Sequence, residues 1–395
     1  MQKVDVLVVG AGPVGLSFAR SLAGSGLSLA LVDPQPRAAL AEPAFDGREI
    51  ALTHASRAIM ERLGQWAFLP AEDISALRDA RVMNGSSPFA LTFAAQQRQG
   101  GDLGWLVPNH LIRRSAWQAV QGQAGLELLD GCAVTALAPG PTHTEATLSD
   151  GRVLSVRLVV AADSRFSGTR RMMGIGAQMR DFGKTMLVCR MRHALPHHHA
   201  AWEWFGYGKT LALLPLNGER AGAVVTLPPR AVETLLAMDE ATFGTAITRL
   251  FEHRLGPMTQ EGSRHAYPLV GVYAHRFVGP RYALIGDAAV GMHPVTAHGF
   301  NFGLQSQERL SRALLAAARG GGDIADAALL AGYERAHRRA TRPLYEATNA
   351  IAALYTDDRL PARALRNAAL RLANGVAPFK HAIAAHLTQR GAQLH

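Results

Sequence analysis

Two short apolar runs rich in β-branched residues open the chain, and a segment whose apolar residues have helical spacing lies between them. Residues 4–9 form the first run and residues 27–32 the second, and residues 10–15 join the first run to the helical segment. This order predicts a strand, a helix and a second strand, as in a Rossmann-type unit. The Val-rich run 156–162 predicts another strand buried in a parallel sheet, and residues 281–285 predict one more.

Between residues 176 and 275 the pattern changes to short alternating segments, which predict an antiparallel sheet inserted as a second lobe. Residues 81–107 alternate in the same way and are assigned to this lobe. The predicted nucleotide-binding domain then comprises 1–80, 108–175 and 276–320, and 321–395 form a C-terminal helical region. The helices are expected at 55–63 (capped by Ser56), 111–121, 231–253, 303–319 and 326–356.

The turn after the first run has the spacing G-x-G-x-x-G, with Gly10, Gly12 and Gly15. The first glycine permits the tight turn, the second lets a pyrophosphate approach, and the third lets the helix pack closely. Asp33 closes the next strand and is placed to accept hydrogen bonds from a ribose diol. A structural glycine turn is the alternative, but motif and acid together favour FAD or NAD over NADP.

Two later strands also end in an acid. Asp163 follows the run 156–162, and Gly286-Asp287 follow the run 281–285. Ligand sites of α/β folds lie at such carboxyl ends. The loop 293–304 then leads into a helix, whose N-terminus presents positive potential to an electron-rich ring.

Composition limits the function classes. The 395 residues are 48% hydrophobic and 18% charged, which is typical of a globular chain. No run is long and apolar enough for a membrane span, and no signal peptide is evident, so we expect a cytoplasmic protein. The two cysteines, Cys132 and Cys189, are far apart and are predicted to be buried or inert thiols.

The formal charge is +10, and residues 361–395 contain five basic residues and no acidic one. This tail is either a solvated helical face or a contact for an anionic membrane surface or a partner. No nucleic-acid-binding module is evident. The run His197-His198-His199 is expected to be an exposed loop, because neighbouring residues of a strand point to opposite faces and no other Cys or His cluster supports a metal site.

These motifs, in this order and at comparable spacing, resemble the class A flavoprotein aromatic monooxygenases with the p-hydroxybenzoate hydroxylase-like fold. Within that class the chain is similar to the ubiquinone-biosynthesis hydroxylases, and residues 298–302 are most similar to their UbiM branch. Further matches to these hydroxylases are residues 48–52, 211–216 and 365–380. Two residues depart from the family pattern: Ser164 replaces the usual glycine, and His298 replaces the usual glutamine.

The resemblance implies an α/β fold with an FAD-binding domain, an interleaved antiparallel substrate domain and a C-terminal helical region. It implies hydroxylation of a polyprenylated phenol or quinol through a flavin C4a-hydroperoxide, with NAD(P)H and O₂ as co-substrates. Because only one G-x-G-x-x-G motif is present, NAD(P)H has no dedicated domain of its own. The residues expected to bind FAD are Gly10, Gly12, Gly15, Asp33, Arg48, Arg113, Asp163, Gly286, Asp287, Gly299 and Asn301.

Pro294 and His298 are expected to face the flavin ring, where His298 either assists phenol deprotonation or is a spacer that binds backbone. The alternative for Arg48 and Arg113 is that each is a surface residue that does not contact the cofactor. Trp202, Trp204 and Phe205 are expected to wall the substrate pocket. The alternative functions are a flavin-dependent halogenase, suggested by Trp202-Glu203-Trp204, and a non-catalytic FAD-binding accessory protein of a quinone-synthesis complex.

Overall fold

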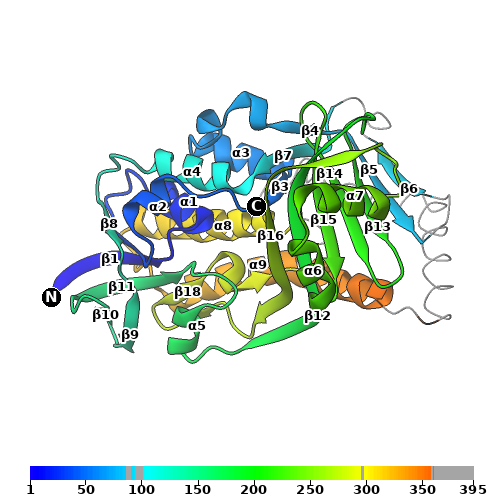
Figure 1. Cartoon of the computed structure of the whole chain (residues 1–395). Coiled ribbons are helices and arrows are strands. Elements are labelled where there is room, and N and C mark those ends of the chain that lie inside the picture. The colour runs from blue at the N-terminus through cyan, green and yellow to red at the C-terminus, as the bar shows by residue number, and fades with distance from the viewer. Residues whose placement is uncertain (86–89, 95–100, 295–297, 357–358, 360–395) are drawn as a thin grey trace.

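The computed structural model describes residues 1–85, 90–94, 101–294, 298–356 and 359. Two lobes lie side by side (Figure 1). One lobe contains the N-terminal strand β1 and a mostly parallel sheet, and the other contains a large antiparallel sheet. The predicted α/β class is therefore confirmed.

The first sheet has the order β17-β18-β11-β1-β2-β8, with the hairpin β9-β10 attached to β11. Strands β18, β11, β1, β2 and β8 pair with one another in parallel, whereas β17 and β10 pair antiparallel with β18 and β11, respectively. The chain order reverses between β1 and β11, so a crevice is expected at the carboxyl ends of these two strands. The bounds are Gln2–Val9 (β1), Leu29–Asp33 (β2), Leu126–Asp130 (β8), Val134–Pro139 (β9), Thr144–Leu148 (β10), Val153–Ala161 (β11), Val278–Gly279 (β17) and Tyr282–Leu284 (β18).

β1, β2 and β11 are buried almost throughout, which explains why their sequences are continuous apolar runs. Helices α1, α2, α4, α8 and α9 pack on this sheet in one hydrophobic core, whereas α3 packs with α4 and α8 in a second core. The bounds of the helices of this lobe are Pro13–Ser21 (α1), Arg37–Ala41 (α2), His54–Arg62 (α3), Asn109–Ala119 (α4), Gly168–Met172 (α5), Gly299–Arg319 (α8) and Ala327–Thr356 (α9), with short 3₁₀ turns at Trp66–Phe68 (η1), Ala71–Asp73 (η2) and Gly286–Ala288 (η4).

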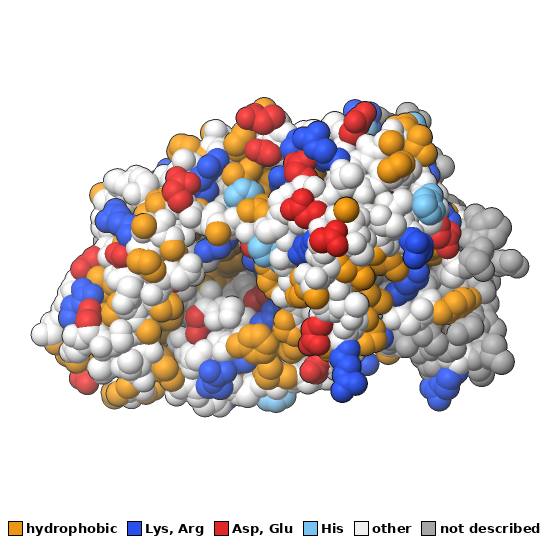
Figure 2. All heavy atoms as spheres, viewed as in Figure 1, with side chains coloured by type: hydrophobic (Ala, Val, Ile, Leu, Met, Phe, Trp, Pro, Cys, Tyr) orange, Lys and Arg blue, Asp and Glu red, His pale blue; other side chains and the backbone are white. Residues whose placement is uncertain are grey.

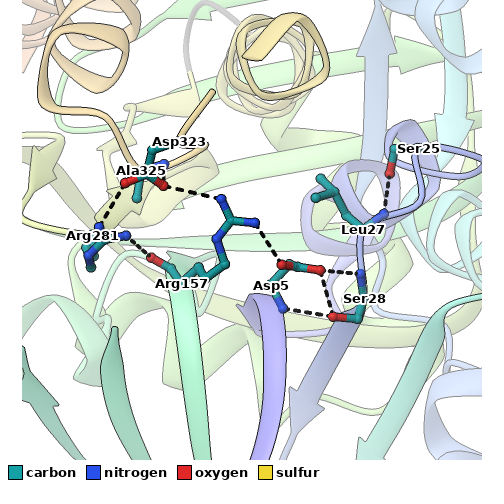
Figure 3. A network of polar contacts seen from close by, with 8 residues as sticks. All are labelled: Asp5, Ser25, Leu27, Ser28, Arg157, Arg281, Asp323 and Ala325. Atoms are coloured by element: carbon teal, nitrogen blue, oxygen red, sulfur yellow. Dashed lines mark hydrogen bonds and ion pairs between the residues drawn. The ribbon is translucent and has the colours of Figure 1, made fainter. Parts of the chain in front are cut away.

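A polar network ties the strands together where β2 and β18 begin (Figure 3). Arg157 of β11 contacts Asp5 of β1 at 3.0 Å and Asp323 of the α8–α9 connection at 3.5 Å. Asp5 accepts hydrogen bonds from the backbone and hydroxyl of Ser28, and Arg281 contacts Asp323 at 2.8 Å. This network lies at the sheet edge opposite to the one where β1 and β2 end, so it fixes the strands without occupying the crevice.

The second sheet has the order β19-β16-β12-β15-β14-β13-β5-β6. One of its faces is covered by α6 and α7. The bounds are Asp79–Asn84 (β5), Ala90–Ala94 (β6), Ala177–His193 (β12), Ala200–Phe205 (β13), Thr210–Pro215 (β14), Arg220–Leu227 (β15), Met258–Ala274 (β16), Val290–Gly291 (β19), Pro229–Leu236 (α6) and Glu240–Leu250 (α7).

A small separate sheet differs from the sequence prediction. Its strands are Glu49–Leu52 (β3), Ser75–Leu77 (β4) and Gly104–Pro108 (β7). Residues 81–107 were assigned to the antiparallel lobe, but β7 pairs with β3 and β4 and not with β5 or β6. A Cβ on Gly104 would lie 2.4 Å from the carbonyl oxygen of Leu52, so this close pairing requires glycine. Alternation predicts a strand but does not specify its partner.

The helix boundaries also differ from the sequence predictions in detail. Thr53, and not Ser56, caps α3, because its hydroxyl accepts a hydrogen bond from the backbone N–H of Ser56. The helix expected at 231–253 is two helices, and Asp239 caps the second. Both cysteines are buried and free, as predicted.

Candidate active site

In the glycine turn after β1, packing requires two of the three glycines, and the third leaves an open space. Gly10 has φ +106°, and a Cβ on it would lie 2.6 Å from the carbonyl oxygen of Ala162. A Cβ on Gly15 would lie 2.0 Å from the carbonyl oxygen of Gly10. At Gly12 the same construction meets no atom within 4 Å, so the fold itself does not require glycine there. Gly12 is the N-cap of α1, and the open space at a helix N-terminus fits an approaching pyrophosphate.

Asp33 stands at the end of β2 beside this turn. Its Oδ2 accepts a hydrogen bond from the Ala11 N–H at 2.7 Å, and its Oδ1 accepts one from the Gln35 N–H at 2.8 Å. A carboxylate oxygen can accept more than one hydrogen bond, so both oxygens retain capacity for a ribose diol. Arg113 of α4 donates to the Gln35 side chain at 3.3 Å, which places it at the ribose end of the crevice.

Asp163 follows β11 and organises the next loop. Its Oδ1 accepts a hydrogen bond from the Ser167 hydroxyl at 2.5 Å, and its Oδ2 accepts one from the Thr169 N–H at 3.0 Å. Ser164 has φ +74°, which is the left-handed region that favours glycine. The usual family glycine at this position therefore has a conformational reason, and serine adopts the same backbone shape at a cost.

Arg170 connects that loop to the turn after β18. Its guanidinium is buried and donates to the carbonyl of Ala288 at 2.9 Å and to that of Arg165 at 3.2 Å. Arg165 in turn forms an ion pair of 2.9 Å with Asp287. The two acidic strand ends therefore belong to one connected edge of the crevice.

Gly286 and Gly303 allow α8 to approach α1. Gly286 has φ +60°, and its N–H donates to the Ser306 hydroxyl at 2.9 Å. A Cβ on Gly303 would lie 2.7 Å from a methyl group of Val14 in α1. The glycine turn, the Gly286 turn and α8 are therefore assembled around one close contact.

The N-terminus of α8 is held against β3. Asn301 accepts a hydrogen bond from the Thr53 N–H at 3.1 Å and donates to the carbonyl of Ala51 at 2.9 Å. The structure thus places the Asn301 amide as a bridge between backbones, whereas Gly299 again meets no atom within 4 Å of a constructed Cβ. His298 is the N-cap, is 3% exposed and lies 5.7 Å from the Phe302 ring. Pro294 is exposed.

Arg48 lies at the junction of the two lobes. It forms an ion pair of 2.6 Å with Asp46, and its guanidinium is 5.2 Å from the centre of the Tyr267 ring of β16. The adjacent Glu49 is fully buried and contacts Arg190 of β12 at 2.7 Å. Burial raises the pKa of Glu49 to about 7, and the Arg190 guanidinium opposes this rise.

The antiparallel sheet turns one face to this junction. A Cβ on Gly47 would lie 2.9 Å from Val188 and 3.0 Å from His265, and one on Gly222 would lie 3.2 Å from Glu49. The segment 46–49 therefore covers this face at β12 and β16. Along β14 the burial alternates, and the residues on this same face, Ala212 and Leu214, are only half-buried.

The opposite face of the sheet is the hydrophobic core of the lobe. Trp204 is 4% exposed and packs there with Leu211, Val225 and the residues of α6 and α7. Trp202 lies on the same face, two residues away along β13. The prediction that Trp202 and Trp204 wall the substrate pocket is therefore wrong, because β13 turns the residues that alternate with them toward the junction of the lobes. Of the three aromatic residues predicted there, Phe205 alone lies on the face that borders the junction.

The crevice is visible from outside. Figure 2 shows the surface hollowed between the lobes, in the region where β1 and β11 end in Figure 1. The structure brings the predicted residues Gly10, Gly12, Gly15, Asp33, Asp163, Gly286 and Asp287 together at one sheet edge through the strands that carry them. The contributions of Arg165, Arg190 and Tyr267 were missed, because no local motif marks contacts between distant segments.

Two sequence expectations concern features outside this crevice. Within the described ranges, no helix is long and apolar enough to cross a membrane. The same ranges contain no group of three or more His, Cys, Asp or Glu residues arranged to hold a metal ion. The basic tail 361–395 lies outside the described residues.

Comparison with known proteins agrees with this geometry. The family model described as "FAD binding domain" matches residues 3–348. The chain therefore belongs to this family of FAD-binding proteins, together with the ubiquinone hydroxylases to which it is similar, and the predicted family and cofactor are confirmed.

Two relatives and one solved structure show how far the similarity extends. Ubiquinone hydroxylase UbiM of Neisseria meningitidis is 45% identical, over 97% of this chain and 84% of the relative. Ubiquinone hydroxylase UbiL of Rhodospirillum rubrum is 35% identical, over 97% and 89%. The crystal structure of p-nitrophenol 4-monooxygenase PnpA from Pseudomonas putida has the same fold, with a TM-score of 0.78 and 17% identity over 98% of this chain and 99% of that one.

Proposed function

We propose that the protein is an FAD-dependent monooxygenase that hydroxylates the aromatic ring of a polyprenylated phenol or quinol in ubiquinone biosynthesis. NAD(P)H is the reductant and O₂ the oxygen donor. The observation that carries this proposal is the open space at Gly12, on a turn where Gly10 and Gly15 are required by packing. The fold keeps that space beside a helix N-terminus and Asp33, which fits a dinucleotide, and the relatives of 45% and 35% identity are named ubiquinone hydroxylases.

Different residues would bind different parts of the cofactor. Gly10, Gly12 and Gly15 admit the pyrophosphate, Asp33 accepts the ribose hydroxyls, and Arg113 supports the ribose end. The edge of the crevice continues toward the antiparallel lobe through Asp163, Gly286, Asp287, Gly299 and Asn301. Arg48, Pro294 and His298 lie at the end of this edge. FAD, when bound, supplies the chemistry of O₂ activation, and the chain excludes water and orients the ring.

The other functions considered receive less support. The pair Trp202 and Trp204 suggested a halogenase, but Trp204 is part of the hydrophobic core on the far face of its sheet. A non-catalytic accessory protein would not need the half-buried sheet face that borders the FAD-binding lobe. We further propose that the tail 361–395 makes a peripheral contact with an anionic membrane or with a quinone-synthesis complex, which would bring the enzyme to its bilayer-borne substrate.

One experiment tests the hydroxylase proposal. The purified flavoprotein is incubated with NADH or NADPH, isotopically labelled O₂ and a phenol that carries a short prenyl chain. The expected product contains one labelled oxygen atom on the ring. Oxidation of NAD(P)H with only hydrogen peroxide as product would contradict the proposal, and a chloride-dependent product would favour the halogenase.

For the tail, the full chain and a chain ending at residue 360 are compared in sedimentation with anionic and neutral vesicles. Release of the shorter chain from the anionic vesicles alone is expected. Equal partitioning of the two chains would contradict the membrane contact.

A further inference from the structure

A carboxyl group on the sheet face that borders the FAD-binding lobe has no role in what is described above. Glu203 stands on β13 between Trp202 and Trp204, so its side chain points to the face opposite the hydrophobic core. It is half-buried, and no hydrogen-bond or ion-pair partner is found for its carboxyl among the described residues. Even partial burial of an acid without a partner is costly, which makes a functional reason worth seeking.

The strand register shows what surrounds Glu203. It pairs with Val82 of β5 on one side and with Ala212 of β14 on the other. Ala212 pairs with Val224 of β15, and Val224 pairs with Val188 of β12. These residues form one row across the face, and all of the others are apolar.

Among the described residues, the FAD-binding lobe covers the row at its Val188 end. Val188 is buried beneath Gly47 of the FAD-binding lobe, while Val82, Ala212 and Val224 are half-buried. Three strand spacings separate β13 from β12, roughly 14 Å. The face is therefore a largely apolar wall that is covered at Val188 and carries one carboxyl group, that of Glu203, three strands away.

His293, which precedes α8, also contacts β12, at a point six residues along the strand from Val188. The His293 ring lies 4.6 Å from the Phe182 ring of β12, in an edge-to-face arrangement. Arg48 and Glu49 reach Tyr267 and Arg190 on the same side of the sheet. A planar, apolar ring placed against the wall would meet aliphatic side chains along its face and the Glu203 carboxyl at its polar edge.

We propose that Glu203 is a catalytic residue of this site, whose carboxylate binds the hydroxyl group of the aromatic substrate and accepts its proton. This inference rests on the proposed hydroxylase function. The phenol O–H bond breaks, the proton moves to a Glu203 oxygen, and the electron pair stays on the phenol oxygen. The ring becomes more electron-rich, which favours its attack on an electrophilic oxygen, and no further oxidant or reductant is needed for the proton transfer.

The electrostatics of the wall suit such a base. Burial alone raises the pKa of Glu203 to about 8, so the ionised form is a stronger base than an ordinary glutamate. The charged or titratable groups on the same face include Arg190 and Arg192 of β12, Arg220 of β15, and His265 and Tyr267 of β16, and Glu261 pairs with Arg192 and Arg220. Arg190 is paired with Glu49, Tyr267 lies under Arg48, and none of these groups contributes to the shift of Glu203.

The test compares Glu203→Gln, Glu203→Asp and Glu219→Gln with the wild-type flavoprotein. Glu219 lies exposed between β14 and β15, so its substitution is the matched control. The readouts are incorporation of labelled oxygen into a short-chain prenylated phenol, the pH profile of kcat/KM, NAD(P)H-dependent flavin reduction without phenol, and flavin content.

We expect the wild-type kcat/KM to rise with pH and to level off above about 8. Glu203→Gln is expected to hydroxylate about 100-fold more slowly without that rise, because general base catalysis contributes factors of this size. Its flavin content and phenol-free reduction should match the wild type, Glu203→Asp should keep the pH-dependent limb at a lower rate, and Glu219→Gln should match the wild type in every readout.

The proposal is overturned if the Glu203→Gln enzyme keeps both the wild-type rate of hydroxylation and the wild-type rise of kcat/KM with pH. If that variant does not fold, Glu203→Asp decides: a slower rate with the limb supports the proposal, and an unchanged rate overturns it. A wild-type flavoprotein that incorporates no labelled oxygen into any phenol shows instead that the proposed function is wrong, whatever the variants do.

Discussion

Gly12 offers a substitution that separates ligand binding from folding. The three glycines of the turn look equivalent in sequence, but a Cβ meets backbone at 2.6 Å on Gly10 and at 2.0 Å on Gly15, and meets nothing within 4 Å on Gly12. Gly12 also has φ −67° and ψ 171°, which any residue adopts. Gly12→Ala should therefore fold normally, while its methyl group occupies the space that the FAD pyrophosphate needs.

The magnitudes follow from these contacts. For the FAD-free protein we expect a change in unfolding free energy within about 0.5 kcal/mol, as for substitutions that disturb no contact. Overpacking by one methyl group costs about 1–3 kcal/mol, which weakens FAD binding by roughly 5- to 150-fold. Gly15→Ala instead forces the backbone apart and should lower the unfolding free energy of the FAD-free protein by about 3 kcal/mol.

The assay measures both quantities on the same preparations. FAD affinity is taken from quenching of flavin fluorescence during titration of the FAD-free protein, and stability from its urea unfolding. Gly332→Ala in α9 is the control for FAD affinity, because its constructed Cβ approaches only the end of the Arg335 side chain, and its own stability should rise by about 0.5–1 kcal/mol because alanine favours a helix. Wild-type FAD affinity in Gly12→Ala would refute the assignment of the pyrophosphate to this turn.

Three further substitutions test other features. Ser164→Gly should stabilise the protein by about 0.5–1 kcal/mol in thermal or urea unfolding, because φ +74° is strained for serine and not for glycine; an unchanged stability would contradict this. Arg190→Met leaves Glu49 buried and unpaired, at a cost of about 3–5 kcal/mol when Glu49 is ionised. Because the pKa of Glu49 is raised to about 7, this loss should grow as pH rises from 5 to 9, and a pH-independent loss would refute the pairing. For His298→Gln we expect the wild-type pH profile of hydroxylation with reduced stability, because the ring is buried beside Phe302, and a lost pH limb would instead show that His298 assists deprotonation.

The sequence predicts the FAD-binding half of the fold well because its signals are local. A strand, a glycine turn and a helix are adjacent in the chain, and the steric reason for Gly15 is the nearby carbonyl of Gly10, although Gly10 itself is constrained by the distant Ala162. The acids at the ends of β2 and β11 follow from the same rule, since parallel strands end at one edge.

The substrate wall could not be predicted in the same way. Alternation along β13 shows that Trp202 and Trp204 share one face and that Glu203 lies on the other, but it does not show which face borders the FAD-binding lobe. That choice is made by α6, α7 and the segment 46–49, which come from other parts of the chain. The partner of β7 was missed for the same reason.

The close contact of Val14 with Gly286 and Gly303 has a consequence for the order of events during synthesis. The glycine turn leaves the ribosome well before the surfaces that pack against it, because these lie almost 300 residues later in the chain. Contacts of such long sequence separation form late in folding. A growing chain therefore exposes the glycine turn before the Gly286 turn and α8, which pack against it, have been made. Tight binding of the flavin cofactor is then possible only after α8 has been translated.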